Sequence, residues 1–556
     1  MNEFSLLDRP WIPIRRRSGS LDRIRPADLP ADQARDPVVA LAWPRPDFDL
    51  ACRELLIGLL CLSAHDVVAD EEAWLEWWER PPSPDELARR YAPFAHAFVL
   101  DGPGPRFMQD FDELDSEPEE IGKLLVEAPG EQTLKRNIDH FVKRGGVPVL
   151  GRAAAAMALF TLQDFAPAGG SGIRTSLRGG GPLVSLVLPP GETEEPSLWH
   201  QLWLNVVWDP RWPGPDADQL PKILPWLAPT RTSEAGQITT PDNVHPAQAY
   251  FGMPRRIRLV FEPNEEGREC GLTGERDAVL AIGFRQRPRG TNYARWRHPL
   301  TPYYRQRPDS AEWLPVHPQP YRLGYRDWLG LVVADQPGEG ALRRPAEVVA
   351  IAHRRLRDLD RKSARWARLR VAGYDMDNMK ARGFVETEMP IPLVAEARRE
   401  AFEAATRELV SRAREVAGLL GSAVRTALWG TDAPGADAGD RYLAQERFWD
   451  RTEPSFRATL GQLVEELEAA GEDEAVRSAL ENARGHFEQT LRRVALAVFD
   501  ELVRFDEIGE DRAMQRRIAA RRFLVGRLRP RSGPGSETAE THRRSETTRT
   551  KRRRAA

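Results

Sequence analysis

The stretch RLRVAGYDMDNMKARGFVETEM, residues 368–389, marks the point where the character of this chain changes. Apolar and polar side chains alternate on both sides of a polar centre, a pattern typical of two strands joined by a turn near Asp375–Lys380. From about Ile391 onward, apolar residues recur at helical spacing. We therefore predict that a hairpin closes a mixed region of strands and helices, and that a helical region follows it. The helical stripe first includes Phe402, Leu409, Val416 and Leu420.

Residues 1–390 predict an irregular α+β domain, a large mixed α/β region of short strands. A buried helix is expected over Asp49–Ala64, and a short helix over Asp70–Arg80 that Asp70 caps. Between Phe165 and Gly181, glycine is so dense that neither a helix nor a strand persists, which predicts a shaped loop. An amphipathic helix is expected from Pro345 to about Arg365.

Residues 391–526 predict four amphipathic helices in succession, which favours an up-down four-helix bundle. Gly430–Gly439 is the clearest linker and separates the first two of these helices. Residues 527–556 are rich in Ser, Thr, Pro, Gly and Arg with almost no apolar side chains. Such a segment buries too little apolar surface to offset its ordering entropy, so we predict a disordered basic tail.

The composition is that of a globular protein of more than one domain. The chain has 556 residues, of which 41% are hydrophobic and 29% charged, and a single core rarely grows to this size. No apolar run reaches the roughly 18 residues of a membrane span, and the N-terminus lacks the apolar run of a signal peptide. We expect a cytoplasmic protein with no membrane partner. The three cysteines, Cys52, Cys61 and Cys270, are too few and too scattered for a disulfide framework.

The charge is unevenly distributed. The formal net charge is −3, whereas Gly526–Ala556 contains ten basic and three acidic residues, a net +7, which leaves −10 for residues 1–525. Any DNA binding by the folded part must therefore come from local basic patches or from partner subunits that supply most of the phosphate attraction.

Motifs for catalysis are weak. The sequence has no phosphate-binding GxxxxGK[ST] motif and no HExxH or HxH pattern, so we expect no cofactor and no bound metal. Asp375–Asn378 begins like a calcium loop, but Met379 and Lys380 occupy the next ligand and glycine positions. The carboxylates of Asp375 and Asp377 leave one enzymatic alternative open, a metal-dependent nuclease. A purely structural scaffold is a third hypothesis.

Five unusual strings occur in an order and spacing that resemble one family. They are Leu7–Pro13, Phe107–Gln109, Ser176–Gly180, His298–Pro302 and Gly373–Tyr374. Together they resemble CasA, the large subunit of the type I-E CRISPR Cascade surveillance complex.

The resemblance implies a non-enzymatic protein of antiviral defence, with a mixed α/β domain and a four-helix bundle. Its implied partners are the other Cascade subunits and guide RNA, double-stranded target DNA, and a helicase-nuclease that it helps recruit. The implied function is to recognise the protospacer-adjacent motif (PAM) through the minor groove. The protein would also help unwind the target, so that guide pairing and R-loop formation begin.

The resemblance also assigns residues. A loop that docks onto the complex falls within Gln132–Gly146, especially Asn137, Ile138, Asp139, His140 and Phe141. A glycine loop is expected at Gly169, Gly170, Ser171 and Gly172, and a basic finger at Arg285, Arg287 and Arg289. A hairpin tip of Asp377, Asn378, Met379 and Lys380 would be the wedge that enters the duplex. The regions that match a four-cysteine zinc site in the family offer only Cys270, so no structural zinc is expected.

Overall fold

The computed structural model describes residues 3–130, 135, 145–191, 194–319, 323–359, 366–430, 438–504 and 511–529. Contacts divide the chain into two compact units, Met1–Ala395 and Glu396–Ala556. No helix in the described ranges is both long and apolar enough to cross a membrane.

Strands of the N-terminal unit form several small antiparallel sheets. Their orders are β2-β1-β3, β10-β9-β11, β13-β12-β6 and β4-β8-β5, and β7 also pairs with β8. The strands are β1 (Ile12–Arg16), β2 (Leu21–Ile24), β3 (Val38–Leu41), β4 (Glu119–Glu120), β5 (Leu150–Gly151), β6 (Val184–Leu188), β7 (Arg256–Pro263), β8 (Val279–Arg287), β9 (Tyr303–Tyr304), β10 (Leu314–Pro315), β11 (Arg343–Arg344), β12 (Trp366–Asp377) and β13 (Lys380–Pro392).

Helices of this unit surround a core built on α1 and α6, which pack against each other. The helices are α1 (Pro46–Ser63), α2 (His65–Val68), α3 (Glu71–Glu79), α4 (Pro84–Tyr91), α6 (Arg152–Phe165), α7 (Leu198–Trp203), α8 (Leu220–Ile223), α9 (Trp328–Leu331) and α10 (Glu347–Leu359). Both α1 and α6 are buried over most of their length, and the first half of α1 buries Asp47, Arg53 and Glu54 as well as apolar side chains.

The predicted helix boundaries are close to those observed. Helix α1 begins three residues before the predicted Asp49, because Pro46 suits the first helical position, where its missing N–H costs nothing. Helix α3 has the predicted cap: Oδ1 of Asp70 accepts hydrogen bonds from the amides of Glu72 and Ala73 at 2.9 and 3.0 Å. Such a cap satisfies donors that the first turn otherwise leaves unpaired.

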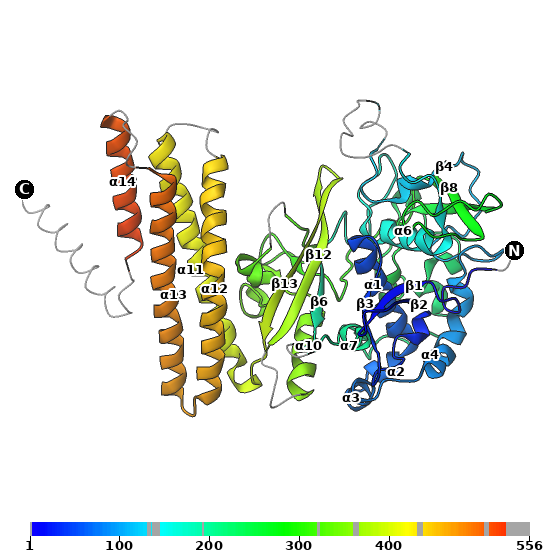
Figure 1. The fold of residues 1–556 in the computed structure, drawn as a ribbon, viewed down its shortest axis with the longest axis horizontal. Coiled ribbons are helices and arrows are strands. Elements are labelled where there is room, and N and C mark those ends of the chain that lie inside the picture. Colours follow the sequence, from blue (N-terminus) through cyan, green and yellow to red (C-terminus); the bar gives the residue numbers. More distant parts are fainter. Residues whose placement is uncertain are drawn as a thin grey trace, which may run out of the picture. The chain divides into compact units, whose positions relative to one another are not determined.

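The hairpin of β12 and β13 is longer and tighter than its sequence predicts (Figure 1). Only Asn378 and Met379 form the turn, and both have positive φ angles, 47° and 61°. Two consecutive positive φ angles are those of a type I′ turn, whose twist matches that of the flanking strands. Asp375, Asp377 and Lys380, which we expected in the turn, therefore lie within the strands.

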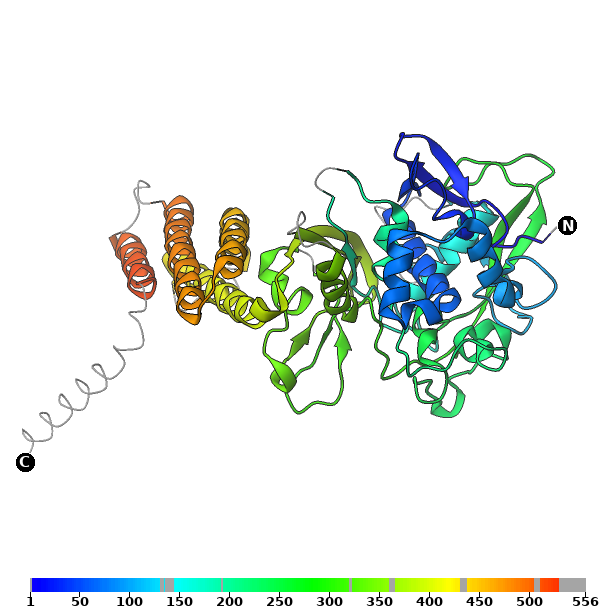
Figure 2. The same cartoon turned by 90° about the horizontal axis from the view of Figure 1, so that it is seen from below.

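The C-terminal unit consists of long helices that lie side by side (Figures 1 and 2). They are α11 (Glu396–Trp429), α12 (Ala438–Ala469), α13 (Asp473–Leu502) and α14 (Asp511–Arg527). Helix α11 contacts each of the other three, and its predicted stripe of Phe402, Leu409, Val416 and Leu420 is buried. The predicted fold class, a mixed α/β region followed by long helices, is confirmed. The tail was predicted to begin at residue 527, but Arg527 ends α14, and the amide of Leu528 donates to the carbonyl of Leu524 at 3.0 Å. The rest of the predicted tail, from residue 530 onward, lies outside the described residues.

Candidate nucleic-acid interface

The glycine loop, Gly169–Gly172, is an exposed turn that follows α6. The amide of Ile173 donates to the carbonyl of Gly170 at 3.2 Å, which closes the turn. Gly170 and Gly172 have φ angles of 114° and 78°, a conformation that residues with a Cβ rarely adopt. A Cβ on Gly170 would meet nothing within 4 Å, so the backbone at this point faces open space. The loop thus presents a main chain that another molecule can approach closely.

The buried side chain of Arg255 contacts the backbone at the start of the glycine loop. Its Nη2 donates to the carbonyl of Pro167 at 2.5 Å and would lie 3.4 Å from a Cβ placed on Gly169. The side chain is buried, and in the described chain it forms no ion pair. Burial lowers the pKa of Arg255 to about 10, so the group remains charged at neutral pH. A buried cation with no paired carboxylate therefore lies under the loop.

The basic finger is the end of strand β8 and the residues that follow it. Arg285 donates to the carbonyl of Ser116, Arg287 forms an ion pair with Asp115, and Arg289 lies 3.7 Å from Glu234. The side chain of Arg289 is 64% exposed. The finger is therefore basic and accessible at its end, but nearby acidic groups reduce its field.

The glycine loop and the basic finger are joined directly. The amide of Arg289 donates to the carbonyl of Gly172 at 2.6 Å, and a Cβ on Gly172 would lie 3.0 Å from Cβ of Pro288. Two segments that the sequence predicted separately thus form one surface.

The hairpin tip contacts the same glycine-rich segment farther along the chain. A Cβ on Gly180 would lie 3.3 Å from Sδ of Met379, and one on Gly181 would lie 2.7 Å from the carbonyl oxygen of Tyr374. Met379 is nevertheless 47% exposed. Residues 165–181 therefore contact the finger at Gly172, near their middle, and the hairpin tip at Gly180, near their C-terminal end.

The exposed tip stores backbone strain. A positive φ is tolerated by Asn, but for Met it costs on the order of 1–3 kcal/mol. An exposed apolar side chain held in such a conformation at the end of a long hairpin has the geometry of a wedge.

A buried polar network anchors the glycine-rich segment. Arg178, whose side chain is 1% exposed, forms ion pairs with Asp164 at 2.6 Å and Glu54 at 2.9 Å, and it donates to Oγ1 of Thr301 at 3.1 Å. Nε2 of His298 lies 3.9 Å from Glu54. The network explains why the strings at 176–180 and 298–302 occur together, because their side chains meet here.

Burial dominates the electrostatics of this network. Burial raises the pKa of Glu54 well above its usual range, although Arg178 opposes this. Burial would lower the pKa of Arg178, but the carboxylates of Asp164 and Glu54 outweigh burial and raise it. Burial, assisted by the charge of Arg178, lowers the pKa of His298 well below its usual range. His298 is therefore neutral in the folded protein at physiological pH.

The acidic pair of the nuclease alternative already has a cationic partner. Arg382 donates to both carboxylate oxygens of Asp375, at 2.7 and 2.9 Å, and lies 3.8 Å from Asp377. A metal bound at Asp375 would have to displace this guanidinium. No group of three or more His, Cys, Asp or Glu side chains in the described chain is arranged to hold a metal ion.

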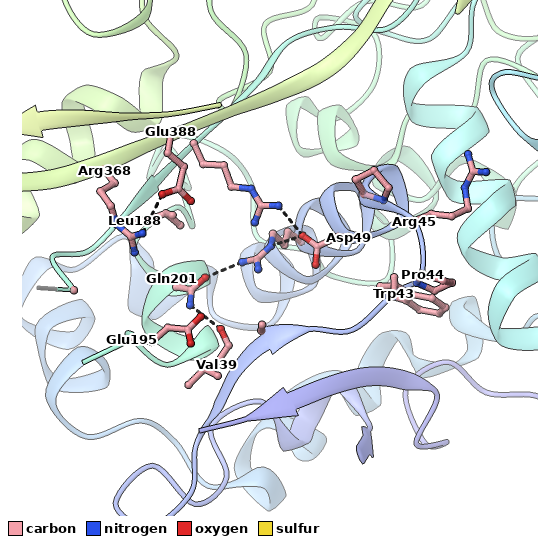
Figure 3. A pocket seen from close by; sticks show the side chains of 15 residues that line it. Val39, Trp43, Pro44, Arg45, Asp49, Leu188, Glu195, Gln201, Arg368 and Glu388 are labelled. Atoms are coloured by element: carbon pink, nitrogen blue, oxygen red, sulfur yellow. Dashed lines mark hydrogen bonds and ion pairs between the residues drawn. The ribbon is translucent and has the colours of Figure 1, made fainter. Parts of the chain in front are cut away.

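A hollow of about 580 Å³ lies between α1 and the base of the hairpin (Figure 3). Its arginines are already bound: Asp49 accepts from Arg53 at 3.0 Å and Arg370 at 3.1 Å, and Arg368 pairs with Glu388 at 3.0 Å. Arg370 precedes the turn by eight residues, roughly 27 Å along a strand. The hollow is therefore separate from the tip, and the ion pair of Asp49 with Arg370 holds the base of the hairpin to α1.

The structure describes most, but not all, of the site residues that were predicted from the sequence. Those of the glycine loop, basic finger and hairpin tip lie around one glycine-rich segment, whereas the docking residues Asn137–Phe141 lie outside the described residues. Sequence reasoning missed Arg255 and Arg178. The pair Arg255–Arg256 at the start of β7 gave no sign of burial in the sequence, whereas Arg178 lies within a string that already stood out.

Comparisons with known proteins agree with this arrangement of elements. The sequence model of one family, CRISPR-associated protein Cse1, matches residues 5–498. The structure resembles CasA of Thermus thermophilus, with 20% identity, a TM-score of 0.64, and coverage of 95% of this chain and 99% of that one. It also resembles Cse1 of Thermobifida fusca, with 19% identity, a TM-score of 0.66, and coverage of 95% and 97%. A chain of a CRISPR RNA-guided surveillance complex matches with 16% identity, a TM-score of 0.65, and coverage of 94% and 100%.

Proposed function

Since this chain belongs to the family of CRISPR-associated protein Cse1, we propose that it is the large subunit of a type I-E Cascade surveillance complex. In this role it recognises the PAM in double-stranded DNA and helps separate the strands so that guide RNA pairing can begin. It acts by binding and not by bond chemistry. Its partners are the other Cascade subunits with their guide RNA, the target DNA and a helicase-nuclease.

The observation that carries the proposal is the meeting of three segments around residues 165–181. The carbonyl of Gly172 accepts a hydrogen bond from the amide of Arg289 in the basic finger, and Gly180 adjoins Met379 of the hairpin tip. A reader of the motif and a wedge thus lie next to each other, as is required if recognition is to be followed at once by opening.

The chemistry of the glycine loop suits the minor groove. There A·T and T·A pairs present similar acceptors and guanine adds one amino donor, so a main-chain reader tolerates several related motifs. Gly170 lets the backbone approach the groove edge without a side chain in the way. The exposed guanidinium of Arg289 suits a narrow groove, where the potential is most negative.

The hairpin tip supplies the opening step. Unstacking base pairs costs a few kcal/mol per step, and an inserted apolar side chain offsets part of that cost. Met379 is the apolar group that the turn exposes, and Asn378 is the adjacent amide. Once the first pairs are open, the guide RNA forms its seed heteroduplex with the target strand.

The remaining parts of the chain complete the proposal. Asn137–Phe141 dock onto the complex near the motif, and the C-terminal helices help recruit the helicase-nuclease. Because residues 1–525 carry a net charge of −10, the isolated protein binds DNA weakly and with steep salt dependence.

The proposal is tested by assembling the complex with and without this subunit on duplexes that carry a library of flanking motifs. We expect motif preference, and fluorescence of 2-aminopurine at the first target positions, only when the subunit is present. Equal motif preference in its absence would contradict the proposal. Incubation of labelled DNA with the protein and Mg²⁺ or Mn²⁺ tests the nuclease alternative, because cleavage that is lost in Asp375→Asn would support it.

A further inference from the structure

Three arginines surround Trp313, the residue that precedes β10 of the sheet β10-β9-β11. The guanidinium carbons of Arg344, Arg305 and Arg297 lie 4.5, 4.9 and 5.8 Å from the centre of the Trp313 ring. Trp313 and Arg344 are half-buried, Arg297 is exposed, and Arg305 is buried. We call these four residues the Trp313 cluster.

Two cations of the Trp313 cluster are not neutralised by an ion pair. In the described chain, neither Arg297 nor Arg344 forms one, and Arg344 donates only to the carbonyl of Gly338 at 3.3 Å. Glu347 acts on Arg297 only through longer-range electrostatics. Asp309 and Glu312 are exposed in the loop before β10 and do not pair with these arginines in the described chain. Like charges gathered without a carboxylate in contact produce a local positive field, which Glu347 reduces from a distance.

Stacking on an indole leaves the edge of a guanidinium available. A cation–π contact uses the flat face of the group, while its N–H donors point outward in a planar fork that matches phosphate oxygens. Trp313 therefore orders the side chains of Arg297 and Arg344 without consuming their donors. This is the chemistry of a phosphate site, because Arg binds phosphate through two parallel hydrogen bonds.

The Trp313 cluster connects directly to the candidate DNA interface. Four residues after Trp313, Nδ1 of His317 lies 3.4 Å from the carbonyl oxygen of Gly181, and the amide of Leu183 donates to the carbonyl of Val316 at 2.9 Å. Four extended residues span about 13 Å at most. The cluster therefore lies about 13 Å or less along the chain from the segment that adjoins the hairpin tip, a length of a few base pairs of DNA.

We propose that Arg297 and Arg344 of the Trp313 cluster bind the phosphate backbone of a DNA strand beside the hairpin tip. Arg305 adds charge from within the fold, and Trp313 positions the guanidinium groups. The contact carries no sequence information, since phosphates are the same at every base. The inference rests on the proposed function, but it concerns affinity and leaves motif choice to the glycine loop and the basic finger.

The test compares the salt dependence of DNA binding by the assembled complex with wild-type subunit and with Arg297→Gln/Arg344→Gln. Loss of two phosphate contacts should reduce the slope of log K against log[salt] by about 1.8 on duplex DNA, or about 1.4 on a separated strand. At 150 mM salt this corresponds to roughly 10- to 30-fold weaker binding. Measurements on intact duplex, on duplex with a mismatched bubble beside the motif, and on single-stranded DNA identify which strand form supplies the phosphates.

Arg276→Gln is the matched control, because Arg276 is 71% exposed, pairs with Glu269 and lies before the opposite end of β8 from the basic finger. It should leave the slope unchanged. If the double variant is unstable, Arg297→Gln alone provides the test, because Arg297 is exposed and its replacement should not disturb the fold. The slope for this single variant should fall by about half as much as for the double variant.

An unchanged slope and affinity in the folded variants would overturn the inference, and so would a fall in thermal stability with no change in slope, since that marks a structural contact only. Failure of the proposed function would be seen separately, because the wild-type complex would then show no preference among motifs. The double variant should keep the wild-type ratio of affinities for correct and incorrect motifs.

Discussion

The amide of Arg289 donates a 2.6 Å hydrogen bond to the carbonyl of Gly172, which joins the end of strand β8 to the glycine loop. Both residues have positive φ angles, 63° and 78°. Only Arg289 carries a Cβ in this conformation, which is uncommon for such a residue, and the hydrogen bond couples it to the glycine loop. Under the proposed function, a change in either segment should be felt as a change in motif recognition.

Ser171→Trp should weaken motif recognition without unfolding the protein. Ser171 is exposed and its φ is not positive, so a larger side chain fits the fold but keeps the loop away from a groove. We expect the affinity for the correct motif to fall by roughly 1–3 kcal/mol, comparable to one mismatched base pair. Binding competition with the assembled complex measures this. Ser478→Trp, on the exposed surface of α13, is the control, and equal motif preference in both variants would show that the glycine loop is misassigned.

Met379→Gly should stabilise the hairpin while impairing strand separation. Glycine relieves a positive φ of 61°, worth on the order of 1–3 kcal/mol, but removes the side chain that would enter the duplex. Fluorescence of 2-aminopurine should rise more slowly on an intact target and at the wild-type rate on a target with open pairs beside the motif. Met379→Leu keeps an apolar side chain and should open the intact duplex normally. Wild-type opening by Met379→Gly would remove the wedge assignment.

Arg255→Met should loosen the glycine loop with little effect on thermal stability. The variant loses the hydrogen bond to Pro167, worth about 1 kcal/mol, but it also removes a buried charge that has no ion pair in the described chain. We expect a nearly unchanged melting temperature and a loss of motif preference in the assembled complex. Arg106→Met is the matched control, because Arg106 likewise donates to a carbonyl, that of Gly102 at 2.7 Å. If both variants keep their motif preference, the loop does not depend on Arg255.

Because of His298, the free energy of unfolding should decrease as the pH is lowered below about 6.5. Burial lowers its pKa in the folded state, so the unfolded chain takes up a proton first as pH falls and folding is penalised. The stabilisation is complete above the unfolded pKa of about 6.5, and about 1 kcal/mol should be lost between pH 7 and pH 5.5. Asn retains an acceptor for the amide of Leu300, now bound to Nδ1 at 3.1 Å.

Urea midpoints of the protein with His298 and of the protein with His298→Asn at the two pH values measure this contribution. Both proteins carry Glu54→Gln, because the raised pKa of Glu54 acts in the opposite direction and His298 lies 3.9 Å from it. A stability difference that does not vary with pH would show that His298 does not titrate on unfolding.

Much of the secondary structure follows from the sequence because its signals are local. Asp70 before an amphipathic stretch predicts a capped helix, and alternation over residues 368–389 predicts a hairpin, since both depend on residues a few positions apart. The change to helical spacing after Ile391 likewise predicts the long helices of the C-terminal unit. The extent of the turn was less well predicted, because pairing of Asp377 with Lys380 depends on the twist of the whole hairpin.

The neighbours of each site residue depend on the tertiary structure. Gly172 meets Arg289, and Gly180 meets Met379, only because strands from distant parts of the chain pack against one glycine-rich segment. Sequence also does not separate buried Arg178 from exposed Arg297, since both are arginines in segments rich in glycine or proline. Burial of Arg178 is favourable because Glu54 and Asp164 offset its desolvation, and such pairing is decided by packing over the whole unit.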